Sequence, residues 1–276
     1  MKEFIKRWFL PQGVFEFIKM LITLLVLYAT KGNFKKTIKR SKTIKNKYKG
    51  KRCFILGNAP TIKNIDIKLL KDEYVFVMST FYNHPDYKSL NKSFFSCVQI
   101  PDSINDKDKL VLLKAIDKNT TTTKTFFLSL EQKKMIERNS LFKDKDIYYI
   151  ATTFKKRSFD LSKITRRYLT NVIQTLEVAM YLGFTEIYLH SVNLNSLATD
   201  GKYRYFFDRT SLPVKDIAIN GDSSSKDFFA EAQILNSLFK DFKEVKEYAR
   251  ENNHKVYITN KESLLRFFKY RAFNEV

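Results

Sequence analysis

The sequence predicts an α/β fold of the doubly wound, Rossmann-like kind: a mostly parallel sheet with helices on both faces. From residue 51 onward, short apolar runs alternate with segments of helical periodicity, as in chains that cross over between parallel strands. Most of these runs are continuously apolar, which is typical of strands covered on both faces. The chain of 276 residues is long enough for one large domain of this type.

The expected elements follow in chain order. The apolar runs predict strands at 52–56, 74–78, 94–99, 125–130, 146–151, 186–192 and 255–259. Helical periodicity predicts helices at 108–116, 131–139, 166–183 and 227–252. The stretches 153–165 and 195–225 have no clear pattern. The second follows the end of a predicted strand, where ligands bind in open α/β sheets, so we expect it to be a binding loop or a lid.

Residues 1–50 are predicted to precede the α/β domain, which would span 51–276. The apolar part of the N-terminal segment, Met20 to Ala29, covers about ten residues, whereas a membrane-spanning helix needs about twenty. Lys19 and Glu16 would be costly inside a bilayer. We therefore expect an amphipathic helix that lies in the membrane interface. The alternative is a helix packed on the domain or on a second subunit.

A basic tract follows this segment. Lys31 to Arg52 contains nine lysines and two arginines and no acidic residue, within a chain of formal net charge +21. Such a tract favours phosphate groups, and beside an apolar helix it predicts attachment to an anionic membrane surface. No known nucleic-acid motif surrounds it, so we expect no nucleic-acid partner.

The sequence predicts no metal site. Cys53 and Cys97 each lie inside an apolar run, no CxxC pair exists, and the three histidines are scattered. Two DxD patterns, Asp106/Asp108 and Asp144/Asp146, lie in lysine-rich polar stretches rather than after an apolar strand. We interpret both as solvated charge.

Two segments carry residues suited to binding an anion. The strand–turn CFILGNAPT ends in Gly57 and Asn58, where glycine allows a close backbone approach and free N–H groups can hold a phosphate. It is neither a GxGxxG nor a Walker A sequence, and a purely structural turn is the alternative. Arg166 and Arg167, with Thr170 and Asn171, are predicted to occupy the first turns of a long helix, where anions are favoured. An ordinary solvated helix start is the alternative there.

Three stretches of the sequence resemble motifs of known protein families. The stretch KGKRCFILGNAPTIKNIDIKLLKDEYVFVMSTFY resembles the opening of the bacterial sialyltransferases of glycosyltransferase family 42. It also resembles the wider group of MptE-like (6-hydroxymethylpterin diphosphokinase-like) domains. The stretch TEIYLHSVN after the long helix, and more weakly ITNKESLLRFF, are similar to later motifs of the same families. Together they cover about residues 48 to 270.

The resemblance implies a metal-independent, inverting glycosyltransferase of GT-A-like fold that uses a CMP-activated sugar and no cofactor. It implies Asp222 as general base, in a Gly-Asp-Ser stretch where the sialyltransferases carry His, because a carboxylate can also take a proton from a hydroxyl. Asp222 could instead cap the helix that begins near residue 226. Tyr203 or Tyr205 would stabilise the leaving phosphate. The implied nucleotide-binding residues are Gly57, Asn58, Pro60, Thr61, Ser79, Thr80, Pro101, Arg167, Thr170, Asn171, Asn193 and Asn195.

The resemblance also implies the setting of the reaction. The partners would be a nucleotide-sugar donor, a glycan or glycolipid acceptor of surface polysaccharide or lipopolysaccharide, and an anionic membrane at the cytoplasmic face of the inner membrane. A homo-oligomer stays compatible with the sequence. Ser191 and Asn193 replace the families' Gly and Asp, which leaves two alternatives open: an MptE-like diphosphokinase, or a non-catalytic MptE-like binding module in polysaccharide biosynthesis.

Overall fold

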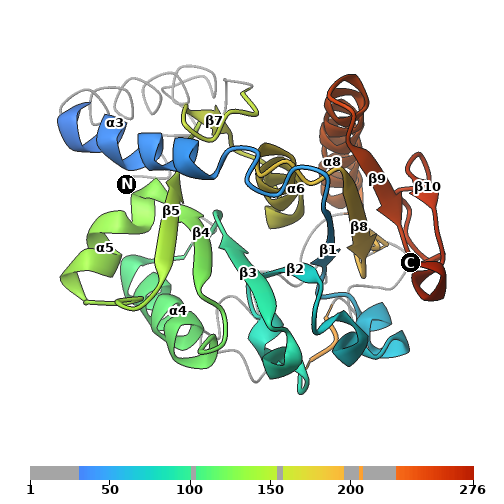
Figure 1. Cartoon of the computed structure of the whole chain (residues 1–276), viewed down its shortest axis with the longest axis horizontal. Helices are drawn as coiled ribbons and strands as arrows, with labels where there is room; N and C mark the ends of the chain where they lie inside the picture. Colours follow the sequence, from blue (N-terminus) through green and yellow to red (C-terminus); the bar gives the residue numbers. More distant parts are fainter. Residues whose placement is uncertain (1–30, 101–103, 154–157, 196–204, 208–227) are drawn as a thin grey trace.

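The structure is a computed structural model that describes residues 31–100, 104–153, 158–195, 205–207 and 228–276 (Figure 1). Its centre is an eight-stranded sheet of order β10-β9-β8-β1-β2-β3-β4-β5 in which every neighbouring pair is parallel. The strands are β1 Arg52–Leu56, β2 Tyr74–Met78, β3 Lys92–Cys97, β4 Thr125–Ser129, β5 Asp146–Ile150, β8 Glu186–His190, β9 Lys255–Ile258 and β10 Lys269–Tyr270. The predicted fold class is therefore confirmed, and each of the predicted strands is present.

Two buried layers explain why the strands are apolar throughout. Successive side chains point to opposite faces of a sheet, so Cys53 and Ile55 of β1 enter one core while Phe54 and Leu56 enter the other. Residues of α6 Asn171–Tyr181 and α8 Phe228–Glu251 fill the first core. Residues of α4 Asp106–Asn119 and α5 Lys133–Arg138 contribute to the second. A doubly wound architecture follows from this arrangement.

The start of α6 differs from the prediction. A helix was expected from residue 166, but Thr165–Arg166 forms a short strand, β7, that pairs in parallel with β6 Thr152–Thr153. The helix begins at Asn171, and the Thr170 hydroxyl caps it by accepting a hydrogen bond from the backbone N–H of Val172 at 3.3 Å. Arg166 and Arg167 therefore lie ahead of the helix rather than in its first turns.

The two DxD patterns have structural roles on the surface. Asn105 caps α4 through the backbone N–H of Asp108 and also donates to that carboxylate at 2.7 Å. Asp146 pairs with Arg40 at 2.9 Å. Among the described residues, no group of three or more His, Cys, Asp or Glu side chains is placed to hold a metal ion.

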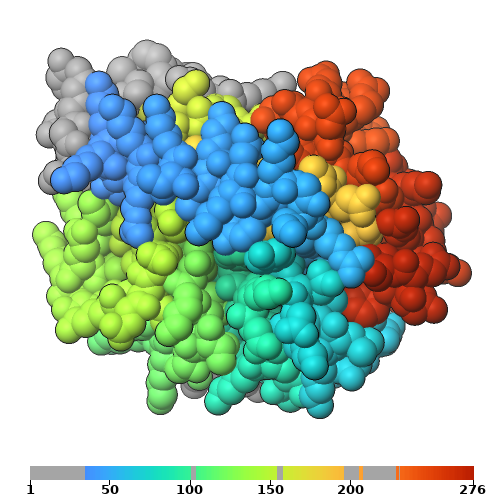
Figure 2. Space-filling model, viewed as in Figure 1, coloured from blue at the N-terminus to red at the C-terminus, as the bar shows by residue number. Residues whose placement is uncertain are grey.

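The described part of the basic tract packs against the sheet. The side chain of Ile38, within α3 Lys31–Lys39, and that of Ile44, in the 3₁₀ turn that follows α3, are buried. The backbone N–H groups of Asn46 and Tyr48 donate to the carbonyls of Tyr181 and Leu182 at the end of α6. Figure 2 shows this segment as a continuous blue band across the upper part of the molecule. The band is thus held in place by hydrogen bonds and core contacts.

The predicted interfacial helix within residues 14–30 lies outside the described residues. Within the described part of the chain, no helix combines the length and the apolar content needed to cross a bilayer.

Candidate functional site

The strand order reverses between β1 and β8, and this reversal marks the candidate site. From β1 the chain moves outward through β2, β3, β4 and β5, and it later returns to the other side of β1 through β8, β9 and β10. In open α/β sheets, ligands bind outside the carboxyl ends of the strands at such a switch point. Gly57 follows β1 and Ser191 follows β8, so the predicted turn borders this position.

Gly57 lets the two strand ends come together. Its backbone N–H donates to the carbonyl of His190 at 2.8 Å. A Cβ atom at this position would overlap the carbonyl oxygen of Ser191 and lie 2.7 Å from its carbonyl carbon. Only glycine fits without moving the backbone of one strand end, so Gly57 has a structural function whether or not a ligand binds at the switch point.

A buried polar cluster connects the turns at the switch point. The hydroxyl of Thr61 donates towards Asn193 Oδ1 at 3.2 Å and lies 3.1 Å from Ser191 Oγ. Asn260, which follows β9, donates to Asn193 Oδ1 at 2.7 Å and accepts from the backbone N–H of Ser191 at 3.2 Å. Thr61 and Asn193, both predicted to contact the nucleotide, thus make hydrogen bonds to protein groups.

His190 adds a second link between the same strands. Its ring is buried, with Nδ1 2.8 Å from the hydroxyl of Thr259 and Nε2 3.4 Å from the carbonyl oxygen of Thr61. Burial lowers the pKa of His190 to about 4, partly offset by the contact with the Thr61 carbonyl. The ring is therefore neutral at pH 7, and its position in the sheet suits a structural role.

Strained backbone occurs at two strand ends near the switch point. Ser79 follows β2 directly with φ 52°, and Ser191 follows β8 directly with φ 57°. Such left-handed conformations cost a non-glycine residue roughly 1–3 kcal/mol and are concentrated at functional sites. Thr80, also predicted to bind the nucleotide, follows Ser79 and is buried.

Four buried polar atoms without a hydrogen-bond partner in the described part of the chain lie at or beyond the ends of the central strands. Asn58 Oδ1 follows β1, the Tyr82 hydroxyl and Asn83 Nδ2 follow β2, and Ser96 Oγ lies near the end of β3. Each of these atoms lacks a hydrogen-bond partner among the described residues. Buried polar groups are nearly always paired, so unpaired ones near a switch point indicate positions where a ligand supplies the partner.

Sequence reasoning identified Asn58 but missed the other three residues. Burial raises the pKa of Tyr82 to about 12, with a further contribution from Cys97, so its phenol stays protonated and can donate. The sequence shows that Tyr82 and Asn83 follow an apolar strand and that Ser96 lies within one. Their isolation from other polar groups depends on tertiary packing.

A short aromatic segment lies against the predicted turn. The backbone N–H of Phe206 donates to the carbonyl of Asn58 at 2.9 Å, and the buried Phe206 ring packs on Phe81 and His84. Tyr205 is partly exposed and stacks on Phe207 with ring centroids 5.4 Å apart. Tyr205, a predicted phosphate-stabilising residue, is therefore next to a residue bound to Asn58.

The start of α6 joins the end of β3. Asn171 Oδ1 accepts from the backbone N–H of Gln99 at 2.8 Å, and Asn171 Nδ2 donates to the carbonyl of the same residue at 3.0 Å. The side chain of Asn171 is thus engaged by protein, while Thr170 caps the helix. The predicted Arg167 is largely buried, 3.7 Å from Glu131.

The remaining predicted residues are placed as follows. Pro60 begins a short 3₁₀ helix, Pro60–Asn64, directly after the Gly57 turn. Asn195 ends the described segment that follows β8. Pro101, Tyr203 and Asp222 lie outside the described residues.

No protein-family model matches the chain, and no curated protein sequence matches it. Among solved structures, the chain is similar to the sialyltransferase CstII from Campylobacter jejuni, in a complex with a substrate analogue, cytidine-5'-monophosphate. The two chains are 20% identical over 82% of this chain and 86% of that chain, with a TM-score of 0.47. A similarity of this size assigns no activity, and the fold described above rests on the sheet order alone.

Proposed function

We propose that this chain is a glycosyltransferase that binds a nucleotide-activated sugar in the crevice between the ends of β1 and β8. One observation carries the proposal. The three stretches that resemble family motifs are far apart in sequence, yet Thr61, Asn193 and Asn260, one from each stretch, meet in one hydrogen-bonded cluster. Motif residues that gather at a topological switch point are what a nucleotide site of this fold requires.

The residues around the crevice supply groups suited to a nucleotide. In the turn after β1, the backbone N–H groups of Gly57 and Ala59 donate to the carbonyls of His190 and Ser191, so the Asn58 side chain is the group of this turn that lacks a partner among the described residues. The unpartnered side-chain oxygen Oδ1 of Asn58 can accept from a base amino group or a ribose hydroxyl. CMP is the expected nucleotide, because the sequence resemblance implies a CMP-activated sugar such as sialic acid or a related sugar.

In the proposed reaction, an acceptor hydroxyl attacks the anomeric carbon of the donor and the nucleotide phosphate leaves with inversion. Asp222 takes the proton from the hydroxyl, and Tyr205 or Tyr203 donates to the leaving phosphate. Hydrogen-bond donors fixed in a desolvated site stabilise charge that develops in a transition state, which provides a metal-independent route. The acceptor is a surface glycan or a glycolipid, presented at an anionic membrane on its cytoplasmic side.

The first experiment measures thermal stabilisation of the full chain by CMP, UDP, ADP and ATP, with and without EDTA. Ligands that bind only the folded state raise its melting temperature by mass action. We expect CMP to stabilise the chain in the presence of EDTA, and Asn58→Ala to weaken the affinity for CMP about tenfold, as loss of one buried hydrogen bond predicts. Asn91→Ala, an exposed change away from the crevice, is the matched control.

The outcomes separate the alternatives. A response to ATP that requires a metal would favour the diphosphokinase, and no response to any nucleotide would favour the non-catalytic module. Once donor hydrolysis is detected with CMP-sialic acid, Asp222→Asn should abolish turnover while CMP still stabilises the fold. Unchanged turnover in that variant would disprove the role of Asp222 as base.

A further inference from the structure

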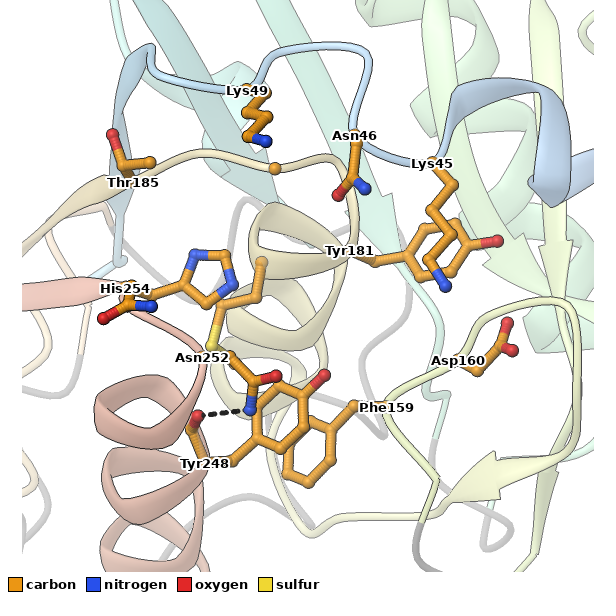
Figure 3. Close-up of a pocket in the computed structure, with 13 residues that line it drawn as sticks. Lys45, Asn46, Lys49, Phe159, Asp160, Tyr181, Thr185, Tyr248, Asn252 and His254 are labelled. Atoms are coloured by element: carbon orange, nitrogen blue, oxygen red, sulfur yellow. Dashed lines mark hydrogen bonds between the residues drawn. The ribbon is translucent and has the colours of Figure 1, made fainter.

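A cavity of about 430 Å³ lies at the edge of the sheet where the strands begin, whereas the switch-point turns lie where the strands end. It is bordered by Lys45, Asn46 and Lys49 of the basic tract and by His254 ahead of β9 (Figure 3). Tyr181 and Gly183, at the end of α6, form part of its wall. These residues precede β8 and β9, so the cavity is at the amino ends of those strands, away from Gly57 and Ser191.

From this cavity we infer a second binding site, which takes a phosphate group and is independent of the proposed nucleotide site. Its volume is within the range of about 300–1,000 Å³ that is usual for small-molecule pockets. A phosphate alone would fill only part of it, so the cavity can also hold the organic group to which the phosphate is attached.

The two lysines form no ion pair with an acid in the part of the chain that the structure describes. Neither Lys45 nor Lys49 has a carboxylate within 4.0 Å among the described residues, whereas the arginines Arg52 and Arg166 are paired with acids at 2.7 and 2.8 Å. Lys45 lies over the ring of Tyr181, with its ammonium 5.8 Å from the ring centroid. Two ammonium groups that lie beside one cavity and contact no carboxylate of the described residues favour an anionic ligand.

The acid in the wall of the cavity does not cancel this charge. Asp160 accepts hydrogen bonds from the backbone N–H and the hydroxyl of Ser162 at 2.9 and 2.6 Å, and Lys163 lies 3.6 Å away. Burial alone would raise the pKa of Asp160, but the bonds from Ser162 and the charges of Lys45 and Lys163 bring it below its ordinary value. The carboxylate is therefore ionised and largely satisfied by its own loop.

Two helix ends face this region, and their carbonyl groups would repel an anion if they were free. At the end of α6, the carbonyls of Tyr181 and Leu182 accept from the backbone N–H groups of Asn46 and Tyr48. At the end of α8, the carbonyl of Ala249 accepts from the N–H of His254 at 2.8 Å. These hydrogen bonds reduce the negative potential of the two helix ends, so the charges of Lys45 and Lys49 dominate at the cavity.

The loop that carries the lysines is fixed in place before any ligand arrives. A Cβ at Gly183 would lie 2.9 Å from Asn46 Cα and 3.1 Å from the backbone nitrogen of Lys49, so the loop packs tightly against the end of α6. Tyr48 stacks on Phe184 at 5.0 Å with an interplanar angle of 4°. A preformed site loses little entropy on binding. His254 Nδ1 donates to the carbonyl of Phe184 at 2.7 Å, which fixes its ring at the cavity wall.

The test compares two double variants of the full chain with equal loss of charge. Lys45→Gln/Lys49→Gln removes the cavity lysines, and Lys42→Gln/Lys47→Gln removes two lysines of the same tract that do not line the cavity. The probes are inorganic phosphate, pyrophosphate, and vesicles of phosphatidate or phosphatidylglycerol matched in surface charge. We expect the first variant to bind phosphate probes at least about tenfold more weakly than the second. Lys45→Arg/Lys49→Arg should restore binding.

The probes also identify the source of the phosphate. Saturable binding of soluble phosphate or pyrophosphate, lost only in the cavity variant, supports a soluble ligand. A preference for phosphatidate vesicles, lost only in that variant, supports a lipid headgroup. Equal losses in both variants, or no response of the unchanged chain to any phosphate probe, would overturn the inference. Equal melting temperatures of the two variants without ligand are the control for folding.

Discussion

At the scale of single residues, the choice of glycine at position 57 is set by the close approach of Ser191 rather than by the backbone angles of Gly57. The overlap of a Cβ with the Ser191 carbonyl means that any side chain would push β1 and β8 apart at the switch point. The strained Ser191 and the buried cluster around Thr61 and Asn193 depend on this close approach. One residue therefore controls both the local stability and the shape of the crevice.

We expect Gly57→Ala to lower the free energy of unfolding by roughly 1–3 kcal/mol or more, the usual cost of forcing an extra carbon into packed structure. Urea denaturation measures this loss. Gly50→Asn is the control, because Gly50 has open space around it and a left-handed conformation that Asn tolerates. If Gly57→Ala leaves the unfolding midpoint unchanged, the strand ends are not in the close contact described here.

At the scale of elements, the segment after α3 behaves as part of the domain. The Tyr48 ring stacks on Phe184 and also packs against Tyr74 and Phe94, with centroid distances of 4.9 and 5.5 Å. Burial raises the pKa of the Tyr48 phenol, with smaller contributions from Tyr74 and Tyr148. These contacts join the basic tract to the core between α6 and the sheet.

We expect Tyr48→Ala to cost about 2–4 kcal/mol of unfolding free energy, somewhat less than a fully buried aromatic residue, because the ring is half-buried. Tyr48→Phe keeps the ring contacts and should retain most of the stability. Guanidinium denaturation of the three proteins provides the comparison. Equal stability of Tyr48→Ala and the unchanged chain would show that packing of the basic tract does not stabilise the domain.

At the scale of the whole molecule, one buried acid makes the stability depend on pH. Glu177 of α6 accepts from the Tyr168 hydroxyl at 2.6 Å and from Gln174 Nε2 at 3.3 Å. Burial raises the pKa of Glu177 to about 8, although the bond from Tyr168 and the charge of Arg166 oppose the shift. The folded protein therefore keeps a proton that the unfolded chain releases above its ordinary pKa of about 4.3.

The sign of the effect follows from proton linkage. Between about pH 4.5 and pH 8 the folded state binds more protons than the unfolded state at this site, so its contribution to stability falls as pH rises. Glu177→Gln removes that dependence, and we expect the variant to gain stability relative to the unchanged chain from pH 5 to pH 8. Urea denaturation at both values measures this. If the unfolding free energies of the two proteins changed in parallel with pH, the raised pKa of Glu177 would be contradicted.

Much of the fold could be predicted from the sequence, because apolar runs and helical periodicity are local patterns. The runs at 52–56 and 74–78 match β1 and β2, and the helical pattern at 227–252 closely matches α8. The start of α6 was predicted too early, because the pairing of Thr165–Arg166 with Thr152–Thr153 is a tertiary contact that competes with helix formation. Propensity along the chain cannot report such a competition.

The candidate site could likewise be predicted only in part from the sequence. The sequence by itself determined that a Gly57-Asn58 turn follows a buried strand, since apolar patterning and glycine chemistry are properties of neighbouring residues. Only the tertiary structure decided that Thr61 and Asn193 bind each other and that Lys45 and Lys49 border a cavity. The physical reason is that hydrogen-bond partners and cavities arise between segments more than a hundred residues apart, and their positions are fixed by how the layers pack.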